Sequence, residues 1–96
     1  MTLEAALEKL ADCRRVIDRI DAQIVALLNE RARVVEVIAR VKQESSMPVY
    51  EPKREDEVYR NVTEKNQGPL DPEAVKRVFE RVIDEMRTLQ KTRMQG

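Results

Sequence analysis

Residues 1–47 read MTLEAALEKLADCRRVIDRIDAQIVALLNERARVVEVIARVKQESSM and contain neither glycine nor proline. Large apolar residues recur in this stretch at steps of three and four, which is the spacing of one face of an α-helix. The pattern predicts one long amphipathic helix over roughly residues 4–43. Its apolar stripe consists of Leu3, Leu7, Leu10, Ile17, Ile20, Ile24, Leu27, Val34, Ile38 and Val41.

The first helix should end at the serines before Pro48, because the residue before a proline is pushed out of the α region. A second helix should begin near Glu51 and Pro52, since proline is tolerated in a first turn and a carboxylate suits the positive end of a helix. Its thin apolar face consists of Val58, Tyr59 and Val62.

The run Asn66-Gln67-Gly68-Pro69 should stop the second helix. Asp71 then has the character of an N-cap and Pro72 that of a first helical residue, which predicts a third helix running to about Thr92. Its apolar stripe consists of Val75, Val78, Phe79, Val82, Ile83, Met86 and Leu89. The fold class expected is therefore all-α, with one long and two shorter helices.

The composition limits the number of domains and the kinds of partner that we expect. The 96 residues suit one domain, residues 1–96, and 18 basic residues balance 18 acidic ones, so we expect neither nucleic acid nor a membrane as partner. A lone Cys13, no signal-peptide pattern and no long apolar run favour a soluble protein of the cytoplasm.

With no histidine and two glycines, zinc sites, catalytic triads and phosphate loops are disfavoured. We expect no cofactor or metal, and any catalysis must use arginine, lysine, carboxylates and amides.

The length of the first helix predicts that the chain forms a homodimer. About 40 helical residues extend about 60 Å at 1.5 Å each, whereas a domain of this size has a radius of gyration of about 12 Å. The two shorter helices cannot cover the whole apolar stripe of the first. We expect a second copy of the chain to cover the rest, in an intertwined dimer whose long helices pack together.

Charged residues interrupt the apolar stripe of the first helix at Arg14, Asp21, Arg31 and Lys42. Arg31 and Lys42 are eleven residues apart, which is three turns plus about 20°, so they point the same way. A half-buried cation is costly without a partner, and each should meet a carboxylate of the protein or of a ligand. A structural ion pair is the alternative for both, and we assign Asp21 to such a structural role.

The two shorter helices also carry polar residues on their apolar faces. Gln90 continues the stripe of the third helix, and Glu51 and Glu55 continue the face of the second, with Arg54 beside them. Three helices thus offer cations, an amide and two carboxylates to a common interior. Such a set suits a small polyanion that carries a hydroxyl group.

These residues form a pattern: Arg14, Ile17-Asp18-Arg19-Ile20-Asp21, Leu27-Leu28-Asn29-Glu30-Arg31, Lys42, and Pro48-Val49-Tyr50-Glu51-Pro52-Lys53-Arg54-Glu55. The pattern resembles the helical chorismate mutases, including the mutase domains fused to prephenate dehydratase. The likeness covers the chain from about Leu10 to Gln90. It implies a homodimer with two equivalent sites, each completed by Arg14 from the other chain.

The resemblance also implies roles. Arg31 and the second copy's Arg14 would hold the two carboxylates of chorismate, and Lys42 would contact a carboxylate and the ether oxygen, which Gln90 would also reach. Glu55 and the backbone near Glu51 would hold the ring hydroxyl. Arg54 would support the charges. Met86, a core residue by its position, would line the substrate site where some members have serine, and Glu51 stands where many have aspartate.

The rearrangement of chorismate to prephenate, a step towards phenylalanine and tyrosine, needs no proton transfer, nucleophile or metal. It suits a chain without histidine, because catalysis would come from substrate orientation and from cations near the breaking C–O bond. Two alternatives stay open at this point. One is an isochorismate pyruvate lyase of the same fold, and the other is a non-catalytic helical dimerisation or regulatory module.

Overall fold

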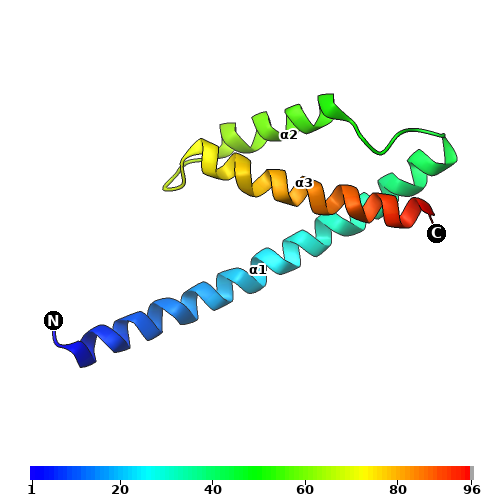
Figure 1. The fold of residues 1–96 in the computed structure, drawn as a ribbon. Coiled ribbons are helices and arrows are strands. Elements are labelled where there is room, and N and C mark those ends of the chain that lie inside the picture. The colour runs from blue at the N-terminus through cyan, green and yellow to red at the C-terminus, as the bar shows by residue number, and fades with distance from the viewer. Residues whose placement is uncertain (96) are drawn as a thin grey trace. The chain divides into compact units, whose positions relative to one another are not determined.

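The computed structural model describes residues 1–95 and contains three helices, α1 (Leu3–Glu44), α2 (Pro52–Lys65) and α3 (Pro72–Gln95), with no strand in that range (Figure 1). The predicted all-α class is confirmed, and the starts and ends of α1 and α2 lie within a residue or two of those expected. By its internal contacts the chain divides into a first unit, Met1–Arg31, and a second unit that begins at Ala32. None of the helices described is both long and apolar enough to cross a membrane.

The end of α1 is closed by backbone hydrogen bonds. The Met47 amide donates to the Lys42 carbonyl at 2.8 Å and the Ser46 amide to the Gln43 carbonyl at 3.4 Å, while Ser46 has a φ of 54°. This is the bonding pattern of a Schellman motif, with serine at the left-handed position that glycine usually takes. The last turn of α1, which carries Lys42, is therefore fixed in place and the chain turns sharply after it.

The start of α3 has the predicted cap, because the Asp71 carboxylate accepts a hydrogen bond from the Ala74 amide at 2.8 Å. The predicted end near Thr92 is wrong, since α3 continues to Gln95. Two contacts with α1 hold this last turn: the Gln43 side-chain amide donates to the Met94 carbonyl at 3.1 Å, and Arg93 pairs with Glu36 at 2.6 Å.

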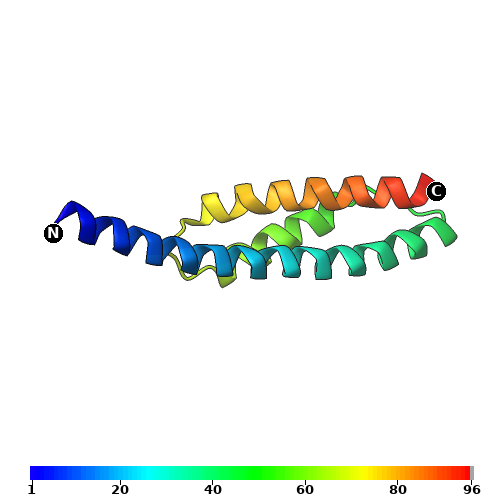
Figure 2. The same cartoon turned by 90° about the horizontal axis from the view of Figure 1, so that it is seen from below.

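The core of the second unit is small. α2 and α3 pack against each other (Figures 1 and 2), and the buried apolar residues are Val35 and Ala39 of α1 with Ile83 and Met86 of α3. Val78, expected in the stripe of α3, is 56% exposed. Its position explains the error, because five helical steps place Val78 about 140° round the helix from Ile83.

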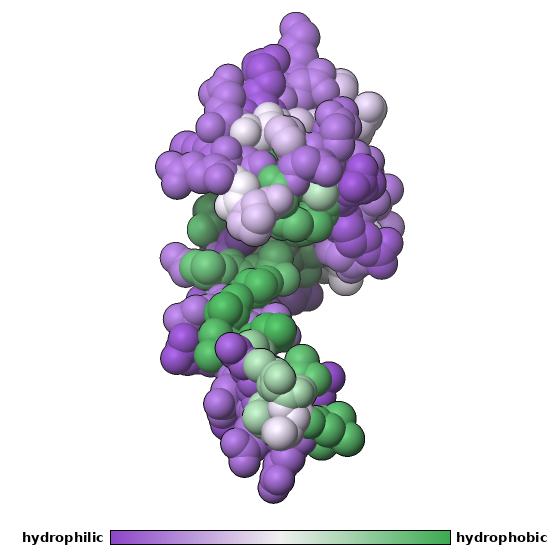
Figure 3. All heavy atoms as spheres, turned by 90° about the vertical axis from the view of Figure 1, so that its left-hand side faces the viewer, coloured by the Kyte–Doolittle hydropathy of each residue, from purple (hydrophilic) through white to green (hydrophobic). Residues whose placement is uncertain are grey.

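The apolar stripe of α1 is wider than the face that this chain buries. Val35, Ala39 and Lys42 follow one another at steps of four and three and are buried, whereas Val34 and Val41 are 58% and 52% exposed. In the first unit the predicted stripe is exposed as well, and Figure 3 shows hydrophobic residues in green on the surface. Members of this exposed set include Leu7, Leu10, Ile17, Ile20, Ile24 and Leu27.

Candidate functional site

A buried lysine lies at the centre of the candidate site. Lys42 is 4% exposed, and its ammonium group donates to the Val49 carbonyl and to Gln90 Oε1, both at 2.9 Å. Glu51 Oε1 lies 2.6 Å from the same nitrogen. Three partners match the three donors of an ammonium group, so its charge is fully compensated inside the fold.

Each partner of Lys42 is supplied by a different local feature of the sequence. The Schellman turn after α1 sends the chain back past the ammonium group, which brings the carbonyl of Val49 and then Glu51 into reach. Gln90 follows the buried Met86 by four residues on α3, so its side chain continues the buried face. The sequence prediction that Lys42, Gln90 and Glu51 share an interior is therefore matched by their direct contacts.

Lys42 and its acidic partner Glu51 differ in their access to water. The Lys42 side chain is 5% exposed, whereas that of Glu51 is 43% exposed. The carboxylate that pairs with the buried ammonium group is therefore itself partly open to water. An anionic or ether oxygen that took the position of the Glu51 carboxylate would meet a cation already oriented towards it.

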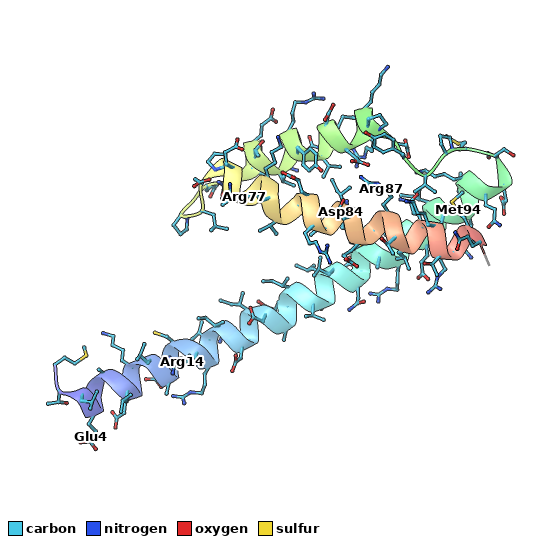
Figure 4. All side chains as sticks on the ribbon, in the orientation of Figure 1. Glu4, Arg14, Arg77, Asp84, Arg87 and Met94 are labelled. Carbon is cyan, nitrogen blue, oxygen red and sulfur yellow. The ribbon has the colours of Figure 1, made fainter. Side chains whose placement is uncertain are left out.

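A second polar cluster joins α2 to α3. Arg87 Nη2 donates to both carboxylate oxygens of Glu55 at 2.7 Å, and Arg87 Nη1 lies 3.3 Å from Asp84 Oδ1. Figure 4 labels Arg87 and Asp84 on α3. The guanidinium group also lies over the ring of Tyr50, 5.5 Å from its centre. The hydrogen bond to Glu55 raises the pKa of Arg87 above its ordinary value, so the group stays cationic.

Arg87 is the site residue that the sequence analysis missed. The residue predicted to support the charges of the site is Arg54, but Arg54 is exposed and forms no hydrogen bond or ion pair within residues 1–95, whereas Arg87 pairs with Glu55. A signal was present in the sequence, because Arg87 follows Ile83 by four residues and precedes Gln90 by three.

The remaining candidates lie elsewhere on the helices. Arg14 and Arg31 belong to the first unit, where Arg14 is exposed (Figure 4) and Arg31 is half-buried. Met86 is 8% exposed and belongs to the core of the second unit. Among residues 1–95, no group of three or more histidine, cysteine, aspartate or glutamate side chains is placed to hold a metal ion.

Comparison with known proteins gives the family. The model of the family described as chorismate mutase type II matches residues 13–91. A chorismate mutase of Methanocaldococcus jannaschii is 30% identical over 86 residues, which cover 88% of this chain and 87% of the relative. The crystal structure of the chorismate mutase of Helicobacter pylori in complex with prephenate is similar with a TM-score of 0.85 and 28% identity, over 93% of this chain and 97% of that one.

Several other relatives are much longer proteins. A bifunctional chorismate mutase/prephenate dehydratase of Aquifex aeolicus is 33% identical over 89 residues, which cover 88% of this chain but 25% of the relative. In the four bifunctional relatives the match spans 21% to 25% of their length. The resemblance seen in the sequence is confirmed: the chain belongs to the type II chorismate mutase family.

Proposed function

We propose that this chain catalyses the rearrangement of chorismate to prephenate. The observation that carries the proposal is the environment of Lys42, a buried cation held by a backbone carbonyl, an amide and a partly exposed carboxylate. Membership of the type II family supports it, as does the likeness to a chorismate mutase that was solved with prephenate.

In the proposed mechanism, Lys42 stabilises the negative charge that grows on the ether oxygen as the C–O bond breaks. The substrate oxygen takes the place of the exposed Glu51 carboxylate, and the ammonium group keeps its bonds to Val49 and Gln90. Because those two acceptors hold the cation before the substrate arrives, little reorganisation is needed in the transition state. A single preorganised donor of this kind contributes on the order of 10²–10³ in rate.

Gln90 supplies a second donor. Its Oε1 accepts the hydrogen bond from Lys42, which leaves the NH₂ group of the amide for a ligand. The contact with Lys42 also fixes which end of the amide faces the lysine. We propose that Gln90 donates to the ether oxygen together with Lys42, so that two donors of different charge meet the same developing anion.

The other predicted residues complete the substrate site in this proposal. Arg31 and the Arg14 of a second copy bind the two carboxylates, which guanidinium groups can hold through paired hydrogen bonds. Glu55, with the backbone near Glu51, accepts the ring hydroxyl. Arg54, which is exposed in the single chain, supports the charges of the site.

Met86 has a packing role in this site. Since it is buried in the core of the second unit, we propose that it supports the wall of the substrate site below Gln90 and does not bind a polar group of the ligand.

We also propose that the active form is a homodimer. The support is the apolar face of α1 that a single chain leaves exposed, including Leu27, Val34 and Val41 at 63%, 58% and 52% exposure. Burying such side chains favours association by roughly 25 cal/mol per Å². Sedimentation should give twice the chain mass, and Val34→Asp should weaken both association and turnover. A monomer with full activity would contradict the dimeric site.

Two further expectations remain proposals. We propose that residues 1–96 act as a single mutase domain, which is supported by the family match over residues 13–91. We also propose a cytoplasmic location, for which the single unpaired Cys13 is the support.

Turnover of chorismate by the purified chain tests the proposed function. Loss of chorismate absorbance with formation of prephenate is expected, and isochorismate should not release pyruvate at a comparable rate. Preferential release of pyruvate from isochorismate would favour the lyase instead. No reaction with either substrate, from a chain shown to be folded and dimeric, would contradict an enzymatic role.

A further inference from the structure

We propose that Arg87 is a positioning residue that orients the Glu55 carboxylate as a hydrogen-bond acceptor for the ring hydroxyl of the substrate. The inference rests on the proposed function and concerns how the site recognises one group of chorismate. Arg87 lies on α3 and Glu55 on α2, and their side chains are 26% and 19% exposed. The pair therefore joins the two helices at a partly buried position.

The geometry of the pair orients the carboxylate. Arg87 Nη2 lies 2.7 Å from Oε1 and 2.7 Å from Oε2 of Glu55, which is the short distance of a charge-assisted hydrogen bond. Such a contact fixes the orientation of the carboxylate. An ionised carboxylate accepts hydrogen bonds only, and each of its oxygens has a second lone pair for another donor. Glu55 is thus prepared to recognise a hydroxyl group as a donor.

Arg87 is itself held from other directions. Asp84 lies one turn earlier on α3, 3.3 Å from Nη1, and the Tyr50 ring lies under the guanidinium group at 5.5 Å. Tyr50 immediately precedes Glu51, so the loop that supplies a partner to Lys42 also packs on Arg87. The adjacent residues Tyr50 and Glu51 therefore connect the two polar clusters.

One donor of the Arg87 guanidinium group differs from the others. The Nε of Arg87 is buried and has no hydrogen-bond partner among the described residues. A buried donor without a partner is unfavourable, and native proteins contain few of them. The arrangement leaves one donor of the guanidinium group unsatisfied while both Nη atoms reach carboxylates. A lysine, as a compact point charge, could not hold both the Glu55 and the Asp84 carboxylates with the same geometry.

The two explanations of the pair make different predictions. If Arg87 is only a structural ion pair, its loss lowers stability and leaves the kinetic constants of the folded enzyme unchanged. If it positions Glu55, its loss weakens a contact made in both the ground state and the transition state. Such a change raises KM and leaves kcat nearly unchanged.

The test compares Arg87→Met with a matched control, Arg81→Met. Arg81 lies on the same helix and also pairs with a glutamate, Glu85, but their side chains are 76% and 60% exposed. Arg87→Met should raise the KM for chorismate about tenfold or more, on the scale of a hydrogen bond to a charged group. Arg81→Met should leave it unchanged, and Arg87→Lys should restore only part of the loss.

Two further measurements separate positioning from stability. In a Glu55→Gln background, Arg87→Met should change KM little more, because the group that it positions is already altered. A chorismate analogue with hydrogen in place of the ring hydroxyl, used as a competitive inhibitor, should bind the wild type and Arg87→Met equally well. If Arg87→Met does not fold, Arg87→Gln, which keeps one donor, takes its place in both measurements.

The outcomes are distinct. Wild-type turnover of chorismate with unchanged KM in the folded Arg87 variants overturns the positioning role and leaves the proposed function in place. Weaker binding of the deoxy analogue by the same factor as chorismate also overturns it, because the effect would then not involve the hydroxyl group. A wild-type chain that does not convert chorismate overturns the proposed function, and the role of Arg87 with it.

Discussion

Replacing Lys42 by methionine removes a buried ammonium group and keeps most of its apolar stem. The side chain is 5% exposed, so its methylene groups belong to the packed interior of the second unit. The exchange leaves a void no larger than about a methyl group and should not collapse the site. Because the charge is lost and the volume is kept, this variant separates the electrostatic role of Lys42 from its packing role.

The change should lower both the catalytic rate and the stability of the fold. Loss of a preorganised donor at the ether oxygen should lower kcat/KM by about 10²–10³-fold, which is about 2.7–4 kcal/mol of transition-state stabilisation. The Val49 carbonyl and Gln90 Oε1, each 2.9 Å from the ammonium nitrogen, also lose their donor. A buried acceptor left without a donor costs roughly 1–3 kcal/mol of stability. Glu51 is 43% exposed at its side chain and can turn to water, so its loss of a partner should add little.

Urea denaturation first establishes the temperatures at which the variant is folded. The assay then measures kcat/KM for chorismate at those temperatures. Lys42→Arg is the control that keeps the charge but changes its geometry, and it should retain more activity than Lys42→Met. A folded Lys42→Met enzyme with kcat/KM within about threefold of the wild type would refute the reasoning, because one donor at the ether oxygen is expected to contribute about 10² or more.

Three other predictions concern single residues. Gln90→Glu keeps an oxygen for Lys42 but removes the amide donor, so at neutral pH we expect turnover to slow by about 10²-fold or more; an unchanged turnover rate would exclude donation by Gln90. Asp71→Ala removes the cap of α3 and should lower the free energy of unfolding by about 0.5–2 kcal/mol, seen as a lower urea midpoint with turnover unchanged. Burial, with the nearby Glu55 charge, raises the pKa of Tyr59, so above about pH 10 the unfolded chain loses this proton first and stability falls as pH rises. Tyr59→Phe should reduce that fall in melting temperature between about pH 9 and 11, and an identical fall in both proteins would contradict it.

The helices could be predicted because their signals are local. The long run without glycine or proline predicted α1, and Asp71 with Pro72 predicted the start of α3, since caps and prolines act within a single turn. The end of α3 could not be predicted in this way. Its last turn is held by contacts with α1, through Gln43 and Arg93, and those depend on how the helices pack.

Only part of the candidate site could be predicted from the sequence. Lys42 and Gln90 stood out because a polar residue on an apolar helical face needs a partner, whatever that partner is. Glu55 was predicted to lie in the site, but its pairing with Arg87 was not predicted. That pairing depends on which face of α2 meets α3.

By itself the sequence determined the all-α class, the order and approximate bounds of the three helices, and the cations and amide that interrupt their apolar faces, because these follow from periodicity along one chain. Tertiary structure alone decided that Lys42 is held by Val49, Glu51 and Gln90, and that Arg87 pairs with Glu55. Pairing between residues far apart in the chain depends on the rotation and distance of packed helices. Helical periodicity places a residue on a face but does not say which residue of another helix lies opposite to it.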